Sequence, residues 1–210
     1  MTGAQLDHTA DIVTDVLTFW LGTPDDPEWG EFKDIWFRAA TPEFDAEIRD
    51  RFLDAHERAA AGDLDHLKDT PEGCLALLIL LDQFPRNMFR GTARAFATDP
   101  NALEIAKHAA AKGFDDNVMP VHRTFLYLPF EHSENLADQE AGIRLMSKVG
   151  RDRAIEAAIE HRDIIVRFGR FPHRNAVLGR ESTPEELDFL NNGGQTFGQV
   201  SGPAKSPETA

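Results

Sequence analysis

Apolar side chains recur at helical spacing along much of the chain, separated by polar positions. An α-helix repeats every ~3.6 residues, so this spacing gathers the apolar residues on one face. The clearest series are Ile12, Val16 and Trp20; Phe44, Ile48 and Phe52; and Ile155, Ile159 and Val166. No segment shows the strict alternation typical of a β-strand. The pattern therefore predicts an all-α fold.

One stretch is apolar on every side. Residues 74–81 read Cys-Leu-Ala-Leu-Leu-Ile-Leu-Leu, which indicates a helix enclosed by its neighbours. The run is much shorter than the roughly 18 apolar residues that a membrane-spanning helix needs. We expect a central core helix that carries Cys74 as a buried thiol.

Capping residues and glycines divide the chain into helices. Starts are predicted where a threonine lies just before or near a proline, at Thr41, Thr70, Thr98 and Thr183. Thr183 and Glu186 also have the spacing of a capping box. Ends are predicted at Gly22, Gly62, Gly113, Gly150 and Gly193. The predicted spans are 8–21, 30–39, 42–61, 71–84, 100–112, 120–131, 134–149, 151–168 and 184–191, some of them short enough to merge, which suggests about eight helices.

The length of 210 residues suits one hydrophobic core. We expect a single helical domain over residues 1–192. Residues 193–210 are rich in Gly, Ser, Pro, Gln and Thr, a composition that buries little apolar area. A flexible C-terminal tail is predicted there.

The formal charge of −14 argues against nucleic acid as a partner, because that binding depends on Lys and Arg contacts to phosphates. The N-terminus lacks the basic and apolar pattern of a secretory signal, so we expect a cytoplasmic protein that does not enter a membrane. We find no glycine-rich phosphate loop and no His-Glu-x-x-His spacing. Neither a cofactor nor a metal site is expected.

Arginine and histidine are concentrated in two places despite the acidic composition. The segment 161–175 holds four Arg and two His against one Asp, and Arg86, Arg90 and Arg94 form a second group. Both contain a similar phrase, Phe-Pro-Arg-Asn at 84–87 and Phe-Pro-His-Arg-Asn at 171–175. This echo fits either a true duplication or two helix ends punctuated by Pro and Asn. Arginine suits carboxylate and phosphate recognition through its planar fork of donors.

Two further positions call for charged or polar partners. Asp82 follows the apolar central helix at helical spacing, and an unpaired charge there is costly, so it needs a cation. Arg123, Tyr127 and Glu131 are spaced i, i+4, i+8 and are predicted to share a helix face. Arg162 falls on the stripe of Ile155, Ile159 and Val166, so its stem is expected to be buried.

We hypothesise that these residues converge on one polar network, and three interpretations stay open. The network binds a small anion or an acidic peptide terminus, it catalyses general acid–base chemistry on an anionic metabolite, or it is a structural lattice in a protein-interaction scaffold. The catalytic candidates are Glu131, His132, His161 and His173. The ligand-binding candidates are Asp82, Arg86, Asn87, Arg123, Tyr127, Arg162, Arg170, Arg174 and Asn175.

Three phrases connect the chain with a known family. Residues 81–87 read Leu-Asp-Gln-Phe-Pro-Arg-Asn, residues 127–134 read Tyr-Leu-Pro-Phe-Glu-His-Ser-Glu, and residues 167–175 read Arg-Phe-Gly-Arg-Phe-Pro-His-Arg-Asn. Over roughly residues 12–199 the chain resembles the bacterial "domain of unknown function 924". The resemblance implies an all-helical, tetratricopeptide-like fold and no established activity. The sequence itself lacks the ~34-residue period of a regular tetratricopeptide array.

Overall fold

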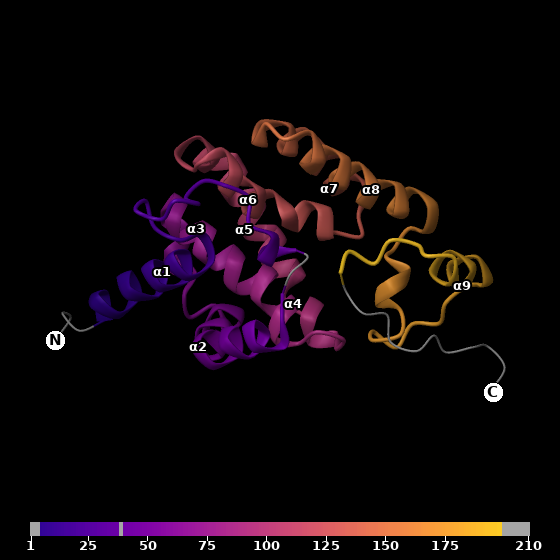
Figure 1. Cartoon of the computed structure of the whole chain (residues 1–210), viewed down its shortest axis with the longest axis horizontal. Helices are drawn as coiled ribbons and strands as arrows, with labels where there is room; N and C mark the ends of the chain where they lie inside the picture. Colours follow the sequence, from indigo (N-terminus) through magenta and orange to yellow (C-terminus); the bar gives the residue numbers. More distant parts are fainter. Residues whose placement is uncertain (1–4, 38–39, 199–210) are drawn as a thin grey trace.

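The computed structural model describes residues 5–37 and 40–198. These residues form helices, turns and loops without a strand (Figure 1), as predicted. The α-helices are α1 (Gln5–Leu21), α2 (Pro42–Ala61), α3 (Pro71–Leu78), α4 (Phe84–Met88), α5 (Asp99–Lys112), α6 (Pro120–His132), α7 (Leu136–Met146), α8 (Asp152–Phe168) and α9 (Pro184–Asn191).

The helix α3 lies at the centre and contacts α1, α5 and α6, while α2 packs against α4. From α5 to α8, each helix packs against the next, and α8 lies at the edge of this series (Figure 1). One hydrophobic core runs from Val16 in α1 to Ala158 in α8 and includes the predicted buried thiol of Cys74. A second, smaller cluster joins the end of α8 to Phe171.

Most predicted caps are present. Thr41, Thr70 and Thr183 accept hydrogen bonds from the first turns of α2, α3 and α9, and Thr183 and Glu186 form the predicted capping box. Gly62 and Gly113 end α2 and α5 in the left-handed conformation, at φ 86° and 68°. Thr98 does not cap α5, because its hydroxyl donates to the Leu81 carbonyl in the central helix.

The central helix is longer than predicted. We expected it to end at residue 84, before Pro85, but α3 continues through a π-helical turn (Ile79–Gln83) into α4. Such a turn interrupts the regular ladder, so the missing N–H of Pro85 is tolerated. Three side chains donate hydrogen bonds to backbone carbonyls of this turn. His56 donates to Leu80, Thr98 to Leu81, and Arg86 to Asp82.

The helix predicted over residues 30–39 is also wrong. Within the described residues of that span only Asp34–Trp36 form a short 3-10 turn. Tertiary packing overrides the local pattern, because Trp36 is buried in the core and its indole N–H donates to the Trp20 carbonyl at 2.9 Å. The backbone is already turned at Gly30, which has φ 79°.

The apolar stripe predicted on α8 is not the face that this helix buries. Val166 is 61% exposed and Ile159 is 36% exposed, whereas Ala158, His161 and Ile165 are buried. Because α8 is an edge helix, it buries the face that carries a small residue and a histidine against α7 and α6. Arg162, whose stem was expected to be buried, is 28% exposed and pairs with Glu140 of α7 at 3.2 Å.

The chain after α9 returns toward α8. Residues 194–198 follow Gly193, and the ring of Phe197 stacks on His161 with 3.6 Å between centroids. The remainder of the predicted tail, from residue 199, lies outside the described residues, and the division at residue 192 stays a prediction. No helix in the described ranges is both long and apolar enough to cross a membrane.

Candidate functional site

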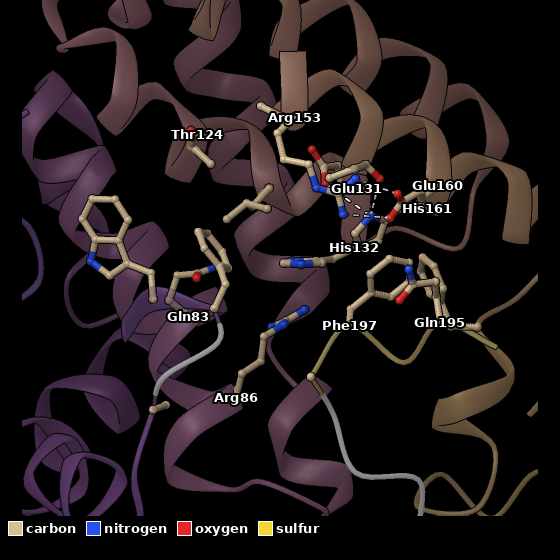
Figure 2. Close-up of a pocket in the computed structure, with 18 of the residues that line it drawn as sticks. Gln83, Arg86, Thr124, Glu131, His132, Arg153, Glu160, His161, Gln195 and Phe197 are labelled. Atoms are coloured by element: carbon tan, nitrogen blue, oxygen red, sulfur yellow. Dashed lines mark hydrogen bonds and ion pairs between the residues drawn. The ribbon is translucent and has the colours of Figure 1, made fainter. Parts of the chain in front are cut away.

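A cavity of about 820 Å³ opens among α4, α6, α8 and three loops. The loops contribute residues 32–37, residues 171–174 and residues 195–198 to its wall. Figure 2 shows Glu131, His132 and His161 close together, with Arg86 and Phe197 nearby. A cavity of this size is typical of sites for small organic ligands.

The helix α6 supplies one side of the cavity. Thr124, Leu128, Glu131 and His132 line it at spacings that keep them on one face. Gly142 of α7 packs closely behind this helix, since a Cβ atom there would lie 3.0 Å from the Phe130 Cβ. The close contact between the two helices fixes Glu131 and His132 in position.

Asp82 and His132 form a buried pair. The Oδ1 atom of Asp82 lies 2.7 Å from Nδ1 of His132 and 3.3 Å from Nη1 of Arg86. Burial alone raises the pKa of Asp82, but Arg86 and His132 outweigh it and lower that pKa to about 2. Burial and Arg86 lower the pKa of His132 despite the opposing carboxylate. The lowered pKa favours the uncharged ring, in which Nδ1 donates to Asp82 and Nε2 carries the lone pair that can accept a proton.

Glu131 differs from Asp82 in that its pKa is raised and not lowered. Its side chain is 2% exposed, and Oε1 has no hydrogen-bond partner in the described part of the chain. Its Oε2 lies 3.4 Å from Nδ1 of His161, but that nitrogen donates to the Ala157 carbonyl at 2.7 Å. Burial, and secondly Asp82, raises the pKa of Glu131 well above its usual value. Burial lowers the pKa of His161, so the contact is between two neutral groups.

Arg86 and Arg174 meet on one carboxylate. Both donate to Oδ2 of Asp99, at 3.2 Å and 3.0 Å. Arg174 is buried, yet its Nε has no partner among residues 5–37 and 40–198, and the same is true of Nδ1 of His173. Burial, followed by Arg174, lowers the pKa of His173 to about 3. The cavity wall thus holds three buried residues with unsatisfied polar atoms, Glu131, His173 and Arg174.

Three segments far apart in the sequence build this wall. They contain Asp82 and Arg86, Glu131 and His132, and His173 and Arg174, and each lies in one of the three phrases that suggested a family. The model of the family described as "Bacterial protein of unknown function (DUF924)" matches residues 16–194. The chain belongs to this family.

A solved structure is also similar to this DUF924 chain. It is described as the structure of a protein of unknown function from Agrobacterium tumefaciens, with 45% sequence identity and a TM-score of 0.79. The match covers 88% of this chain and 99% of the other. No curated protein matches the chain.

Not every predicted site residue of this DUF924 protein reaches the cavity. Asp82, Arg86, Asn87, Glu131, His132, His161, His173 and Arg174 line it or contact its lining. Asn87 donates to Asp45 of α2 at 2.7 Å, beside Arg90, which binds the same carboxylate with two nitrogens.

Five predicted residues lie elsewhere. Arg123 donates to the Val118 carbonyl, and Tyr127 donates to Asp115 at 2.7 Å. Arg162 pairs with Glu140 of α7. Arg170 binds both carboxylate oxygens of Glu186, while Asn175 contacts Ser182 and Arg180. These groups tie local segments together.

Sequence reasoning missed other cavity residues. Arg151 and Arg153 enter from the start of α8, and Phe32, Trp36 and Phe37 enter from the loop before α2. Arg153 pairs with Glu160 at 2.7 Å. None of these five belongs to a motif, and only the tertiary arrangement of their segments brings them here. In the part of the chain that the structure describes, no three His, Cys, Asp or Glu side chains are arranged to hold a metal ion.

Proposed function

We propose that this DUF924 protein binds a small anionic molecule or a peptide carboxy-terminus in the cavity. The observation that carries the proposal is the buried Arg174, which lines the cavity and whose Nε has no partner among the described residues. Buried polar groups in folded proteins are nearly always hydrogen-bonded, and an exception at a cavity wall points to a missing ligand or water. A carboxylate or phosphate oxygen satisfies an arginine N–H especially well.

The surrounding charges favour a ligand with one anionic group. Asp82 and Asp99 already neutralise much of Arg86 and Arg174. The raised pKa of Glu131 favours its protonated form, which can donate a hydrogen bond to the ligand. Attraction to the anion is therefore directional rather than due to a large positive field, and the free N–H of Arg174 and the carboxyl of Glu131 define where it binds.

A thermal-shift screen followed by calorimetry tests this proposal. The panel contains acetate, oxalate, pyruvate, inorganic phosphate and short peptides with free carboxy-termini. A ligand present at about 100 times its Kd stabilises the fold by about 2.7 kcal/mol. We expect Arg174→Gln to weaken binding by about 10- to 100-fold, the equivalent of a charged hydrogen bond.

Arg162→Gln is the matched control, because Arg162 lies outside the cavity on α8 and should leave binding unchanged. No binding by any anion, or equal binding by Arg174→Gln, contradicts the proposal. The buried charges are then a structural lattice, and the search moves to protein partners.

A second candidate function is acid–base catalysis on the bound anion, and the Asp82–His132 pair favours it. The carboxylate orients the ring so that Nε2 is free to accept a proton, and protonated Glu131 is an acid in the same wall. Proton exchange in deuterated water provides a test with 2-oxo acids as probes. Deuterium incorporation next to the carbonyl should fall by about 10²- to 10⁴-fold in His132→Gln and stay unchanged in His66→Gln, whose ring is exposed.

A further inference from the structure

The cavity is much larger than a small anion requires, and one end of it is aromatic. Phe32, Trp36 and Phe37 line this end and contact one another, with 5.8 Å between the centroids of Phe32 and Trp36 and 5.5 Å between those of Phe32 and Phe37. Leu128 of α6 and Met146 of α7 continue the apolar wall. We call Phe32, Trp36 and Phe37 the aromatic end.

The aromatic end is held in place by the fold. The ring of Trp36 packs edge-on against Phe125 of α6 at 4.9 Å, and Phe37 stacks on the same ring at 6.2 Å. The guanidinium of Arg151 lies 4.1 Å from the centroid of the Phe32 ring. The aromatic end is therefore a fixed surface and not a set of freely rotating side chains.

This surface is nevertheless exposed. Phe32 is 36% exposed and Phe37 is 37% exposed. Two neighbouring phenylalanines that face a cavity and stay open to water cost free energy, which a bound apolar group recovers. Their exposure is an observation independent of the unsatisfied polar atoms at Glu131, His173 and Arg174.

The spacing between the two ends sets the length of the ligand. The aromatic end contacts α6 at Phe125, and the polar end contains Glu131 and His132 on the same helix. A helix rises about 1.5 Å per residue, so the two ends are roughly 10 Å apart along α6. Thr124 and Leu128 line the wall between them.

We propose that the ligand is an amphipathic organic anion whose acidic head binds at Arg174 and Glu131 and whose apolar or aryl group packs against Phe32, Trp36 and Phe37. This inference rests on the proposed anion binding, and it names the ligand class. An aryl-substituted or medium-chain carboxylic acid has the required shape and chemistry. A cavity of about 820 Å³ accommodates such a molecule, whereas acetate or phosphate leaves the aromatic end in contact with water alone.

The test is a homologous series of carboxylic acids, measured by calorimetry with the full chain. The series is acetate, benzoate, phenylacetate, 3-phenylpropionate, 4-phenylbutyrate and 5-phenylvalerate. We expect the affinity to rise along the series by about threefold to fourfold per added methylene, which corresponds to ~0.8 kcal/mol, until the ring meets the aromatic end.

A double variant tests where the ring binds. Phe32→Ser with Phe37→Ser should weaken 4-phenylbutyrate at least tenfold and leave acetate unchanged, because both side chains are far from the polar end. Leu178→Ser is the control, since Leu178 is 37% exposed and does not line the cavity. Arg174→Gln should weaken every member of the series by a similar factor.

The outcomes separate the two proposals. If acetate binds but longer members bind no better, the amphipathic ligand is wrong and the anion site stands. If the double variant binds 4-phenylbutyrate as well as the unmodified chain does, the aromatic end is not the binding surface. If no acid binds, both proposals are overturned.

Discussion

Two buried carboxylates, Asp115 bonded to α6 and Glu131 on α6 itself, differ in how completely they are hydrogen-bonded. Asp115 accepts hydrogen bonds from Tyr127 and from Lys148, both at 2.7 Å. Glu131, one turn after Tyr127, has an oxygen without a partner among the described residues. The partners of Asp115 overcome its burial and lower its pKa, whereas burial and Asp82 raise the pKa of Glu131.

The contrast separates a structural cluster from a candidate site. In the Asp115 cluster, which comprises Asp115, Tyr127 and Lys148, hydrogen bonds and an ion pair compensate the buried charge. The cavity cluster comprises Asp82, Glu131, His132, His173 and Arg174, and part of it is uncompensated. Unsatisfied buried groups cost free energy, and three of the residues that carry them, Glu131, His173 and Arg174, line one cavity.

The largest expected effect comes from removing the charge of Asp82. Asp82→Asn leaves Arg86 and His132 without their buried anion, and it should lower the free energy of unfolding at pH 7 by about 3–5 kcal/mol. Asp115→Asn should cost only ~1–3 kcal/mol, because the Lys148 side chain is half-exposed and can turn to water. Urea denaturation of both variants measures the difference.

The pH dependence gives a check on this prediction. The pKa of Asp82 is about 2 in the folded chain and 3.8 as the ordinary value, so its stabilisation is present above pH 4. It is lost as the pH falls toward 2. The gap between Asp82→Asn and the unmodified chain should therefore shrink over that range. A gap that stays constant shows that Asp82 does not act through its charge.

From the sequence, Asp82, Tyr127 and Glu131 are expected to converge on one polar network, whereas the structure divides them between two clusters. Arg123, Tyr127 and Glu131 are spaced four apart, and each step of four residues advances roughly 40° around a helix. Over two steps the direction turns by about 80°, so Arg123 and Tyr127 face Val118 and Asp115 while Glu131 faces the cavity. Residues that follow one helical stripe in the sequence therefore belong to two different clusters.

The fold was predictable wherever local signals decide the structure. Threonine caps and left-handed glycines placed most helix ends, while the π-helical turn before Pro85 depends on His56 and Thr98, which are distant in sequence. The aromatic end lies on a loop whose position follows from packing against Phe125. The tetratricopeptide-like relation that the resemblance implies stays a prediction.

The second-largest effect on stability is expected when the uncompensated carboxyl of Glu131 is removed. Glu131→Gln has the shape of the protonated acid and should stabilise the chain at pH 8 by about 1–3 kcal/mol. Glu131 has a raised pKa in the folded chain, so folding retains a proton that the unfolded chain releases above its ordinary pKa of 4.5. The unmodified chain therefore loses stability as the pH rises above that value, and the variant does not.

Tyr127→Phe is the matched control for this measurement. It lies one turn away on the same helix, and it removes the hydrogen bond to Asp115 without changing a charge at neutral pH. It should destabilise the chain, by an amount that does not change between pH 5 and 8. If Glu131→Gln also destabilises the chain at pH 8, then the charge of the Glu131 carboxylate is compensated in the folded chain. Glu131 and Asp115 would then not differ in the way described above.

The smallest expected effect concerns Lys148, the exposed member of the Asp115 cluster. Lys148→Gln removes an ion pair whose lysine is half-exposed, while Asp115 keeps the hydrogen bond from Tyr127. Stability should fall by no more than about 1 kcal/mol, because half-exposed pairs are weakened by solvent. The loss should shrink further in ~1 M NaCl, where charges are screened over only ~3 Å. Affinity for an anion should stay within about twofold of the unmodified chain, since Asp115, Tyr127 and Lys148 are not among the residues that line the cavity. A tenfold weakening in Lys148→Gln would instead show that the two clusters act as one network. In that case, the completeness of hydrogen bonding does not distinguish structural charges from functional ones in this fold.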